Sequence, residues 1–441
     1  MEPSGYPLLS GLSTVAGARA MRVLFISLSL PPFAESQTIR SAYLIRALAQ
    51  HGVAFDLITA HTVPSMTDPS LESLLPESCR IWRTEVPTYD RIVERLKRAG
   101  RRRLLYLYSN LAYRLFAPDV RRGWNQQAVA LVQQVTERFP PDLLMSASGS
   151  ATAHLAAAQL KRTLQRAWVA DLGDPWSWVD WQHPDTWLKA IQNRWLERRT
   201  LPQADLLIWT TEATQRAYQQ WYHRTIPPSI VIPYGYRQVD FPVAPQPATV
   251  PIRFAYVGAA SRRARNLIPF LEALAHTRNA MSLTLQIVGD ASHHFQRAAH
   301  ALNLPQVHFT GRVSYADSLH YIREAGVLVL VGNKSPYQVP GKTFLYLASG
   351  RPILYLSQMP HADDPTYQLL SAFEGVAVVP NQAQAIREWL EYLNEARFRA
   401  WEAEARMRHA APSLEPYEVH SLGRQLYDSL KHIVERTGCS D

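Results

Sequence analysis

The stretch Val339-Pro-Gly-Lys-Thr-Phe-Leu-Tyr-Leu-Ala-Ser-Gly-Arg-Pro-Ile-Leu354 decides the fold of this chain. A Pro-Gly turn leads into Lys342, a helical run follows, Gly350 ends that run, and 352–356 is typical of a buried strand. A lysine at the start of a helix is well placed to hold a phosphate, because free N–H groups and the positive end of the helix dipole lie there. An ordinary helix-to-strand connection with an exposed lysine would have the same letters, so the rest of the chain must decide.

Apolar runs of strand length alternate with helical patterns along the chain, in the order typical of parallel sheets. The strands are predicted at 23–28, 53–58, 142–145, 167–170, 205–209, 229–232, 252–257, 283–288, 307–309, 327–331 and 352–356. The helices are predicted at 38–50, 152–164, 187–201, 267–275, 315–325, 343–348 and 415–435. Continuous apolar strands indicate sheets that are covered by helices on both faces.

A proline-rich stretch, 242–251, divides this alternation and is the best candidate for a linker. We predict an α/β protein with two doubly wound, Rossmann-like parallel-sheet domains, 21–241 and 252–410, that face each other across a cleft. Residues 1–20 are interpreted as an appendage without the features of a secretory signal, and either Met1 or Met21 could be the initiator. The tail 411–441 is expected to be helical and could cross back to the first domain.

Composition restricts the class of protein. The 441 residues include two cysteines, Cys79 and Cys439, which excludes a disulfide framework or a zinc pattern and fits a reducing compartment. No apolar run is long enough to span a bilayer, so we expect a cytoplasmic protein. The net charge of +9 favours acidic partners. No nucleic-acid recognition motif accompanies this charge, so nucleic acid is not an expected partner.

Four segments occur in a distinctive order. They are Pro31-Pro-Phe-Ala-Glu-Ser-Gln-Thr-Ile-Arg40 with the helix up to Gly52; Pro141-Asp-Leu-Leu-Met-Ser-Ala-Ser-Gly-Ser-Ala-Thr-Ala-His154 followed by Val169-Ala-Asp-Leu-Gly-Asp-Pro-Trp176; Tyr256-Val-Gly258 with three arginines after it; and the opening stretch, 339–354. In this order and spacing they resemble a GT-B fold glycosyltransferase of family 4 (group 1), and the resemblance covers nearly all of 21–433.

The resemblance implies transfer of a sugar from a nucleotide-sugar to a saccharide or lipid-linked acceptor, with retention at the anomeric carbon, in envelope or exopolysaccharide synthesis. Members hold the donor mostly against the second domain and the acceptor mostly against the first. They usually need no metal, and this chain has no Asp-x-Asp pair to bind one. No cofactor is therefore expected.

The departing nucleoside diphosphate needs cations and N–H donors from the protein if no metal is present. Lys342 and one arginine of the cluster after Gly258 are the natural pair, because an arginine can hold phosphate oxygens with two N–H groups. We take Arg263 as that arginine. Three neighbouring arginines cannot all reach one phosphate, so Arg262 and Arg265 are assigned only to donor binding. Gly258 and Gly341 are assigned to the same donor-binding set.

The main departure from the family pattern lies at Leu345, where family members have a glutamate that holds the ribose hydroxyls. Its partner glutamate falls on Tyr337 here. A leucine cannot accept a hydrogen bond, so the usual ribose contact is absent unless Tyr337 and Gln338 replace it. Two alternatives therefore stay open: a non-catalytic relative that binds a sugar, nucleotide or partner protein, and a nucleotide-sugar epimerase.

On the first domain, His154 stands where the family places a residue near the transferred sugar, so it is a candidate catalytic residue. A buried histidine whose hydrogen bonds are satisfied is the plain alternative. The candidate acceptor-side residues lie after strand ends or in the first loop and helix: Ser36, Gln37, Arg40, Asp171, Asp174 and Trp176. The plain alternative is that Asp174 caps a helix and Trp176 belongs to the core. Gly173 stands where relatives often have arginine.

Residues 91–123 form a basic excursion, with ten lysines and arginines opposed by Glu94 and Asp119. Leucines and aromatic residues are interleaved with these charges. The pattern suits docking on an anionic membrane surface, at the inner face of the cell membrane. A solvated basic face over a helical excursion whose leucines and tyrosines form a core would have the same composition.

Overall fold

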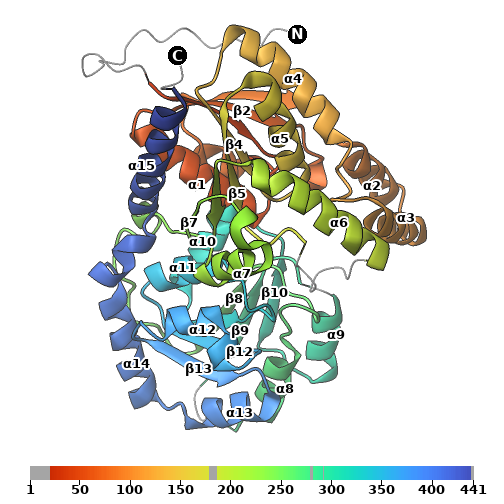
Figure 1. Cartoon of the computed structure of the whole chain (residues 1–441). Coiled ribbons are helices and arrows are strands. Elements are labelled where there is room, and N and C mark those ends of the chain that lie inside the picture. The colour runs from red at the N-terminus through yellow and green to blue at the C-terminus, as the bar shows by residue number, and fades with distance from the viewer. Residues whose placement is uncertain (1–19, 178–185, 279–281, 292, 439–441) are drawn as a thin grey trace.

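The computed structural model describes residues 20–177, 186–278, 282–291 and 293–438, and within these ranges the strands form two parallel sheets (Figure 1). The first sheet has seven strands in the order β3-β2-β1-β4-β5-β6-β7, and the second has six in the order β10-β9-β8-β11-β12-β13. The strands of one sheet precede the predicted linker 242–251 and those of the other follow it. The predicted α/β fold with two parallel sheets is confirmed, while the proposed domain bounds stay a prediction, and all but one residue of the segment 1–20 lies outside the described residues.

The first half of the chain alternates strands and helices around the first sheet. Its strands are β1 (Arg22–Ile26), β2 (Ala54–Ala60), β3 (Arg80–Thr84), β4 (Leu143–Ala147), β5 (Ala167–Leu172), β6 (Leu206–Trp209) and β7 (Ser229–Val231). Its helices are α1 (Ser36–Gln50), α2 (Thr88–Arg98), α3 (Arg102–Leu115), α4 (Trp124–Arg138), α5 (Thr152–Leu164), α6 (Trp187–Thr200) and α7 (Glu212–Tyr222). Buried side chains of α4, α5 and α7 pack with one face of the sheet in a single apolar cluster.

The second half repeats this arrangement. Its strands are β8 (Ile252–Val257), β9 (Leu283–Val288), β10 (Val307–Gly311), β11 (Val327–Val331), β12 (Ile353–Ser357) and β13 (Val376–Pro380). Its helices are α8 (Ile268–His276), α9 (His293–Ala301), α10 (Tyr315–Glu324), α11 (Lys342–Ala348), α12 (Pro365–Leu370), α13 (Ala383–Tyr392) and α14 (Glu395–Arg408). Side chains of α8, α9, α13 and α14 cover one face of the second sheet.

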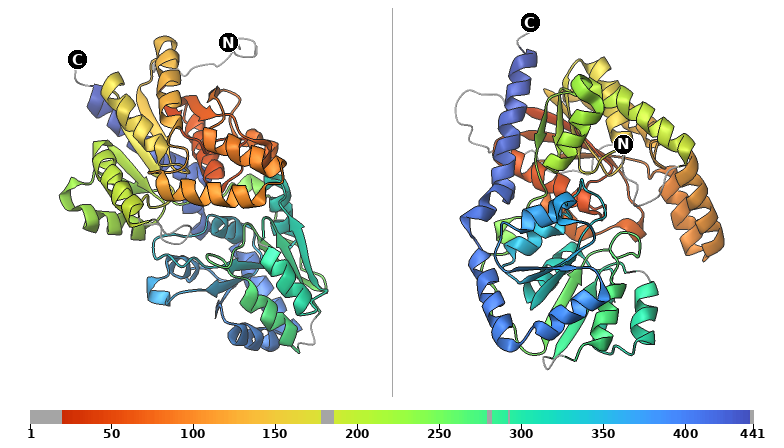
Figure 2. Two further views of the ribbon diagram at one scale, coloured as in Figure 1. Left: turned by 90° about the vertical axis from the view of Figure 1, so that its right-hand side faces the viewer. Right: turned by 60° about the horizontal axis from the view of Figure 1, so that its bottom comes forward.

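One apolar cluster joins the two halves. It contains α1 and the inner face of the first sheet, and it continues into α10 and α11 of the second half. The last helix, α15 (Val419–Gly438), belongs to the same cluster and returns along the first half, where it packs against α1 (Figures 1 and 2). A Cβ atom on Gly423 would lie 2.3 Å from the Cβ of Ala47, so the two helices are in close contact there. The tail therefore crosses back to the first half.

The strands that the sequence did not predict lie at sheet edges. β3 and β13 are outer strands of their sheets, and most of their residues are only partly buried. β3 (Arg-Ile-Trp-Arg-Thr) lacks the continuous apolar run that marks a central strand, whereas β13 (Val-Ala-Val-Val-Pro) has one that the prediction missed. No helix in the described part of the chain is both long and apolar enough to cross a bilayer.

Candidate functional site

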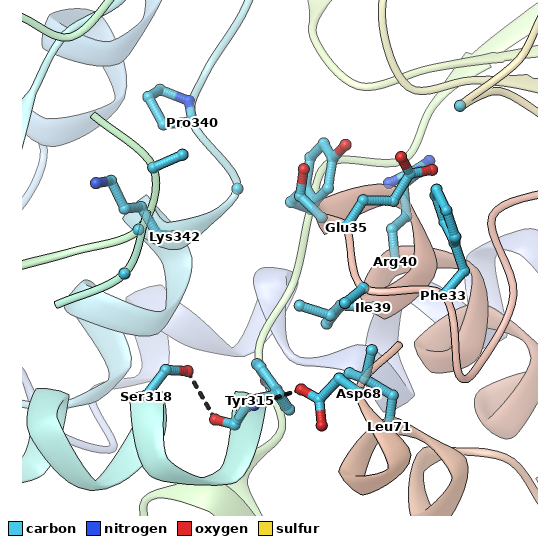
Figure 3. A pocket seen from close by; sticks show the side chains of 18 of the residues that line it. Phe33, Glu35, Ile39, Arg40, Asp68, Leu71, Tyr315, Ser318, Pro340 and Lys342 are labelled. Carbon is cyan, nitrogen blue, oxygen red and sulfur yellow. Dashed lines mark hydrogen bonds between the residues drawn. The ribbon is translucent and has the colours of Figure 1, made fainter. Parts of the chain in front are cut away.

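A cavity of about 770 Å³ lies between the two sheets and is lined by both halves of the chain (Figure 3). Residues just beyond the carboxyl ends of central strands form part of its wall: Gly149 after β4, Gly258 after β8 and Gly289 after β9. This is the edge of a parallel sheet at which ligands are expected to bind. Phe33, Glu35 and other residues of the loop after β1 lie opposite Lys342 across the cavity (Figure 3).

Lys342 is the first residue of α11 and lies in the cavity wall. Its Nζ donates a hydrogen bond of 2.8 Å to the backbone carbonyl of Val257 and lies 3.6 Å from the centre of the Tyr256 ring. Burial, together with the nearby Arg265 guanidinium, lowers the pKa of Lys342 well below the ordinary lysine value. A bound anion would reverse this effect, because a negative charge favours the protonated amine.

Glycines let the backbone approach closely beside Lys342. Gly258 and Gly289 adopt φ values of +124° and +113°, which side chains rarely tolerate. A Cβ atom on Gly258 would lie 3.4 Å from the Lys342 Nζ, and one on Gly289 would lie 2.9 Å from the carbonyl oxygen of Gly258. Gly341 also lines the cavity, and a Cβ atom there would lie 2.7 Å from the Tyr234 ring. Gly258 and Gly341 thus lie in the wall where the sequence predicted donor contacts.

The arginine cluster separates into one residue that faces the cavity and two that do not. Arg265 lines the cavity, and its Nη2 makes only a long contact of 3.5 Å with Asn333 Oδ1. Its Nε is buried and has no hydrogen-bond partner among the described residues. Arg262 and Arg263 are exposed and lie outside the cavity lining. A tight turn, closed by the hydrogen bond of 2.9 Å from the Arg265 N–H to the Ser261 carbonyl, points them to solvent. The geometry thus corrects the choice of Arg263 in favour of Arg265.

Leu345 lies in the cavity wall and leaves no hydrogen-bond acceptor at its position. Tyr337 and Gln338 do not take over its place, because neither lines the cavity. Instead, the carbonyl of Tyr337 accepts hydrogen bonds from the hydroxyls of Thr211 and Thr214, at 2.6 Å and 2.7 Å. Gln338 donates to Asp174. Both residues therefore hold the second half of the chain against the first, and the expectation that they replace the ribose contact is not supported.

His154 is a fully buried residue on the face of α5 that packs against the first sheet. Its Nδ1 lies 2.8 Å from the Ser146 hydroxyl and its Nε2 lies 3.0 Å from the Ser148 hydroxyl. Burial lowers its pKa to about 3, so the ring is neutral at physiological pH. His154 does not line the cavity, and the structure corrects its assignment as a catalytic residue: it is a core histidine with both nitrogens paired.

The acceptor-side candidates of the first helix are only partly in the cavity. Ser36 and Arg40 line it, but the buried Arg40 guanidinium forms a salt bridge of 2.7 Å with the equally buried Asp171. Arg40 also donates to the carbonyl of Pro233 at 2.9 Å, and Gln37 Nε2 donates to Asp171 at 3.3 Å. Asp171 therefore neutralises Arg40 instead of facing the cavity, which corrects its role as a hydroxyl ligand.

Trp176 and Asp174 serve packing and domain contact. The Trp176 ring lies 6.2 Å from the His154 ring and packs against the core of the first half. The backbone N–H of Trp176 donates to the Tyr218 hydroxyl at 2.9 Å. It is not part of the cavity wall, so its predicted role as a sugar platform is corrected. Asp174 is exposed, is not part of the cavity wall and accepts the hydrogen bond from Gln338. At Gly173, a Cβ atom would lie 2.1 Å from the Gln37 Oε1, so an arginine there would have to displace Gln37.

Several charged cavity residues were not predicted. Glu35 accepts a hydrogen bond from the Ser29 hydroxyl, and burial of its carboxyl raises its pKa. Arg121 is held by Asp90, with 2.8 Å between Nε and Oδ2. Asp290 directly follows Gly289 at the end of β9, so the strand-end rule could have identified it. Glu35 and Arg121 lie on loops, and no local sequence pattern predicts that these loops reach the cavity.

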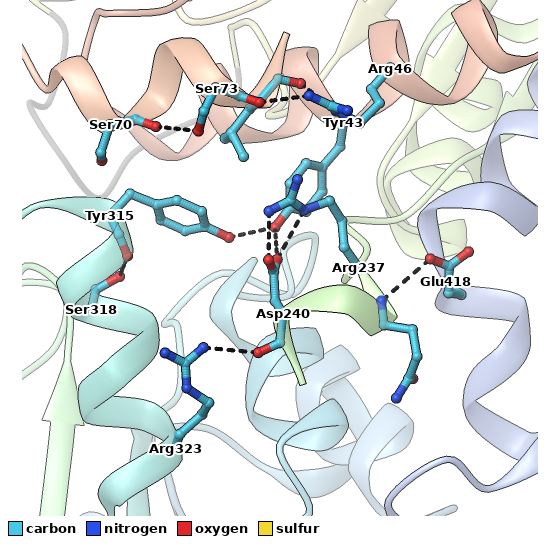
Figure 4. A network of polar contacts seen from close by, with 12 residues as sticks. Tyr43, Arg46, Ser70, Ser73, Arg237, Asp240, Tyr315, Ser318, Arg323 and Glu418 are labelled. Atoms are coloured by element: carbon cyan, nitrogen blue, oxygen red, sulfur yellow. Dashed lines mark hydrogen bonds and ion pairs between the residues drawn. The ribbon is translucent and has the colours of Figure 1, made fainter. Parts of the chain in front are cut away.

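The two halves of the chain are joined on the cavity's floor by a polar network (Figure 4). The Tyr43 hydroxyl lies 2.5 Å from that of Tyr315 and donates to Asp240 Oδ2 at 3.0 Å. Arg237 completes the network through an ion pair with Asp240. At the rim, Arg312 of the second half donates to the carbonyl of Ser65 at 2.8 Å. These contacts hold the two walls of the cavity at a defined separation.

Among the described residues, no group of three or more His, Cys, Asp or Glu side chains is arranged to hold a metal ion. The cations that line the cavity without an ion-pair partner among the described residues are Lys342, Arg265 and Arg312, all from the second half. Carboxylates line it as well: Glu35, Asp68, Asp119 and Asp290. The arrangement can therefore receive an anionic ligand on that side. The expectation that no metal is needed stays a prediction.

Comparisons with known proteins agree with this geometry. Residues 37–235 match the family model described as a glycosyl transferase 4-like domain. Sucrose-phosphate synthase from Thermosynechococcus elongatus is 17% identical with a TM-score of 0.66, covering 94% of this chain and 100% of that one. HepE from Anabaena, in complex with UDP and glucose, is 14% identical with a TM-score of 0.60, covering 93% and 100%. WaaG, a glycosyltransferase involved in lipopolysaccharide biosynthesis, is 14% identical with a TM-score of 0.58, covering 93% and 99%. A search of curated protein sequences found no match. The predicted resemblance to GT-B fold family 4 glycosyltransferases is confirmed.

Proposed function

We propose that this chain, which has the GT-B fold and whose residues 37–235 match the glycosyl transferase 4-like model, moves a sugar from a nucleotide-sugar to an acceptor within the cavity between the sheets. The acceptor is a saccharide or lipid-linked hydroxyl compound, the reaction retains the anomeric configuration, and it contributes to envelope or exopolysaccharide synthesis. No metal takes part.

The observation that carries this proposal is the pair of cations in the second half. Lys342 and Arg265 line the same cavity next to the tight backbone of Gly258, and Arg265 Nε is buried without a partner among the described residues. A buried N–H donor without an acceptor is unfavourable, so a site with one is suited to an anionic ligand. A nucleoside diphosphate provides several acceptor oxygens and the negative charge that both cations need.

The proposed reaction has these steps. The bond between the anomeric carbon and the diphosphate oxygen breaks, and its electron pair leaves with the nucleoside diphosphate. An acceptor hydroxyl oxygen forms the new bond on the same face of the sugar, and its proton passes to the departing phosphate oxygen. Lys342 and Arg265 stabilise the charge that develops on this oxygen, which is the role that fixed donors have at other developing anions.

A uridine nucleotide is the first donor class to test. HepE has been solved in complex with UDP and with UDP-glucose, and it shares the fold over 93% of this chain. The absent acceptor at Leu345 predicts weaker ribose binding than a glutamate would allow. Donor affinity should therefore come mainly from the diphosphate.

A thermal-shift panel of UDP, GDP, ADP and dTDP with their common sugars tests the donor site, and turnover with candidate acceptors follows for the nucleotide that stabilises the protein. Stabilisation by one base with acceptor-dependent release of the nucleoside diphosphate supports the proposal. Stabilisation by a nucleotide, without release of nucleoside diphosphate with any acceptor tested, would favour the non-catalytic alternative. Conversion of the sugar without acceptor would favour an epimerase; a UDP-N-acetylglucosamine 2-epimerase described from Listeria monocytogenes has a similar fold.

A further inference from the structure

Helix α3 carries an exposed apolar stripe. Leu104, Leu107, Leu111 and Leu115 recur at helical spacing, so they lie on one face, and all four are exposed. Tyr106, which is 70% exposed, adds to this surface. Leu105, Tyr108 and Tyr113 pack instead against α2 in a small cluster of their own. The helical excursion predicted from the sequence thus has both a core of its own and a free apolar face.

Helix α6, which is far from α3 in sequence, carries a second exposed apolar stripe. Trp187, Ile191 and Trp195 recur every four residues, and all are exposed, with Trp187 at 76% and Trp195 at 54%. The beginning of α6 contacts the end of α3: Lys189 Nζ donates to the carbonyl of Tyr113 at 2.6 Å. Both helices lie at the same side of the first half (Figure 1). We call the exposed apolar residues of α3 and α6, with their flanking arginines, the α3–α6 surface.

The charge on this surface has one sign. α3 contains no acidic residue, and the one acidic residue of α6, Glu197, is buried; both helices are described throughout. Exposed arginines flank the apolar residues: Arg102, Arg103 and Arg114 on α3, and Arg198 and Arg199 on α6. The Arg199 guanidinium lies 4.7 Å from the centre of the Trp195 ring. Tryptophans beside arginines are typical of surfaces that enter the headgroup layer of a membrane.

The α3–α6 surface also borders the cavity. Tyr113, near the end of α3, is one of the residues that line it, and Asp119 and Arg121 of the following loop line it as well. A molecule held at the α3–α6 surface would therefore lie next to the first-half wall, on the side opposite Lys342. This position is suited to an acceptor that remains anchored in a bilayer.

We propose that the α3–α6 surface docks on an anionic lipid membrane and delivers a lipid-anchored acceptor to the cavity. The identity of the acceptor rests on the proposed function, whereas the docking does not. An anionic bilayer is the partner that fits this surface, because its headgroups attract the arginines and its interface accommodates the exposed tryptophans. A second copy of the chain would place arginines against arginines at a two-fold contact.

The test is flotation of the full-length protein with vesicles of phosphatidylcholine, either alone or with phosphatidylglycerol. We expect binding to the anionic vesicles, weaker binding at high salt, and little binding to the neutral ones. The double variant Trp187→Ser/Trp195→Ser should lose binding about tenfold or more, because its apolar contacts with the headgroup layer are gone. The matched control, Tyr392→Ser/Met407→Ser, changes residues that are 60% and 72% exposed on α13 and α14 and should bind like the wild type.

Arg102→Glu/Arg103→Glu is a second variant, which tests charge without touching the tryptophans. Loss of binding to anionic vesicles in this variant supports the proposal. Equal binding of all variants would overturn it, and so would a wild-type dimer in light scattering that Trp187→Ser/Trp195→Ser converts to monomer. The thermal shift with nucleotide, measured on the same proteins, separates the two proposals. A variant that nucleotide still stabilises but that no longer floats with vesicles has lost membrane docking and kept the donor site.

Discussion

Replacing Lys342 by alanine tests the proposed reaction most directly. The side chain lies in the cavity wall, where its amine makes one hydrogen bond, of 2.8 Å, to the Val257 carbonyl. In the proposed reaction the amine faces a phosphate oxygen whose negative charge grows as the bond to the sugar breaks. Its removal should therefore raise the barrier of the transfer step more than it weakens binding of the intact donor.

The magnitude follows from comparison with other fixed donors at developing anions. Loss of one such donor lowers kcat about 10²–10³-fold, or roughly 2.7–4 kcal/mol of barrier. Stability should change far less. Burial already lowers the pKa of Lys342, so the fold gains little from the ammonium, and the lost hydrogen bond is worth about 1 kcal/mol.

The assay is release of nucleoside diphosphate from the donor identified by thermal shift, measured with and without acceptor, beside a melting curve for each protein. Lys334→Ala is the matched control, since Lys334 is an exposed lysine on the loop after β11 and lies outside the cavity lining. Turnover by Lys342→Ala within a few-fold of the wild type would refute the assignment. A parallel fall in Lys334→Ala would show that loss of any nearby lysine slows the reaction.

Three further predictions concern the same region. Leu345→Glu adds an acceptor to the cavity wall and should tighten nucleotide binding in titration calorimetry, about tenfold if it gains one charge-assisted hydrogen bond; weaker binding would place the ribose elsewhere. The folded-state pKa of His154, about 3, lies below the unfolded value of about 6.5, so the unfolded chain binds the extra proton and stability is lost as pH falls through 6.5. His154→Gln should reduce this loss by roughly 2 kcal/mol at pH 5 in urea unfolding, whereas the exposed control His300→Gln should leave it unchanged. Asp171→Ala leaves the buried Arg40 guanidinium unpaired and should cost roughly 3–5 kcal/mol, most of which Arg40→Met/Asp171→Leu should recover; equal losses in both would argue against the pair.

The sequence predicted most of the central structure because continuous apolar runs mark buried parallel strands. The bounds of β8, β9 and β11 agree with the prediction residue for residue, and so do those of helix α5. The edge strand β3 was not predicted, since most of its residues are only partly buried. Local pattern thus identified all the central strands and two of the four outer ones, β7 and β10, and it missed the outer strands β3 and β13.

The candidate site was predicted less well, because a side chain's direction depends on the element behind it. Lys342, Gly258 and Gly341 follow from local turn and strand-end rules, and all three line the cavity. Arg263 and Arg265 are indistinguishable in sequence, and only the turn at 261–265 decides that Arg265 faces inward. A histidine after a strand end is equally compatible with a site or a core, and packing of α5 against the first sheet decided for the core.

By itself, the sequence determined the strands of two parallel sheets, the lysine that begins α11 in the cavity wall and a basic helical excursion, because each depends on neighbours within a few positions. The tertiary structure decided which charges remain free. Arg40 is neutralised by Asp171, 131 positions away, and α6 meets α3 across a separation of 76 residues. Electrostatic and apolar contacts act over a few ångströms in space, whatever the distance along the chain, so the cavity and the α3–α6 surface exist only once the chain has folded.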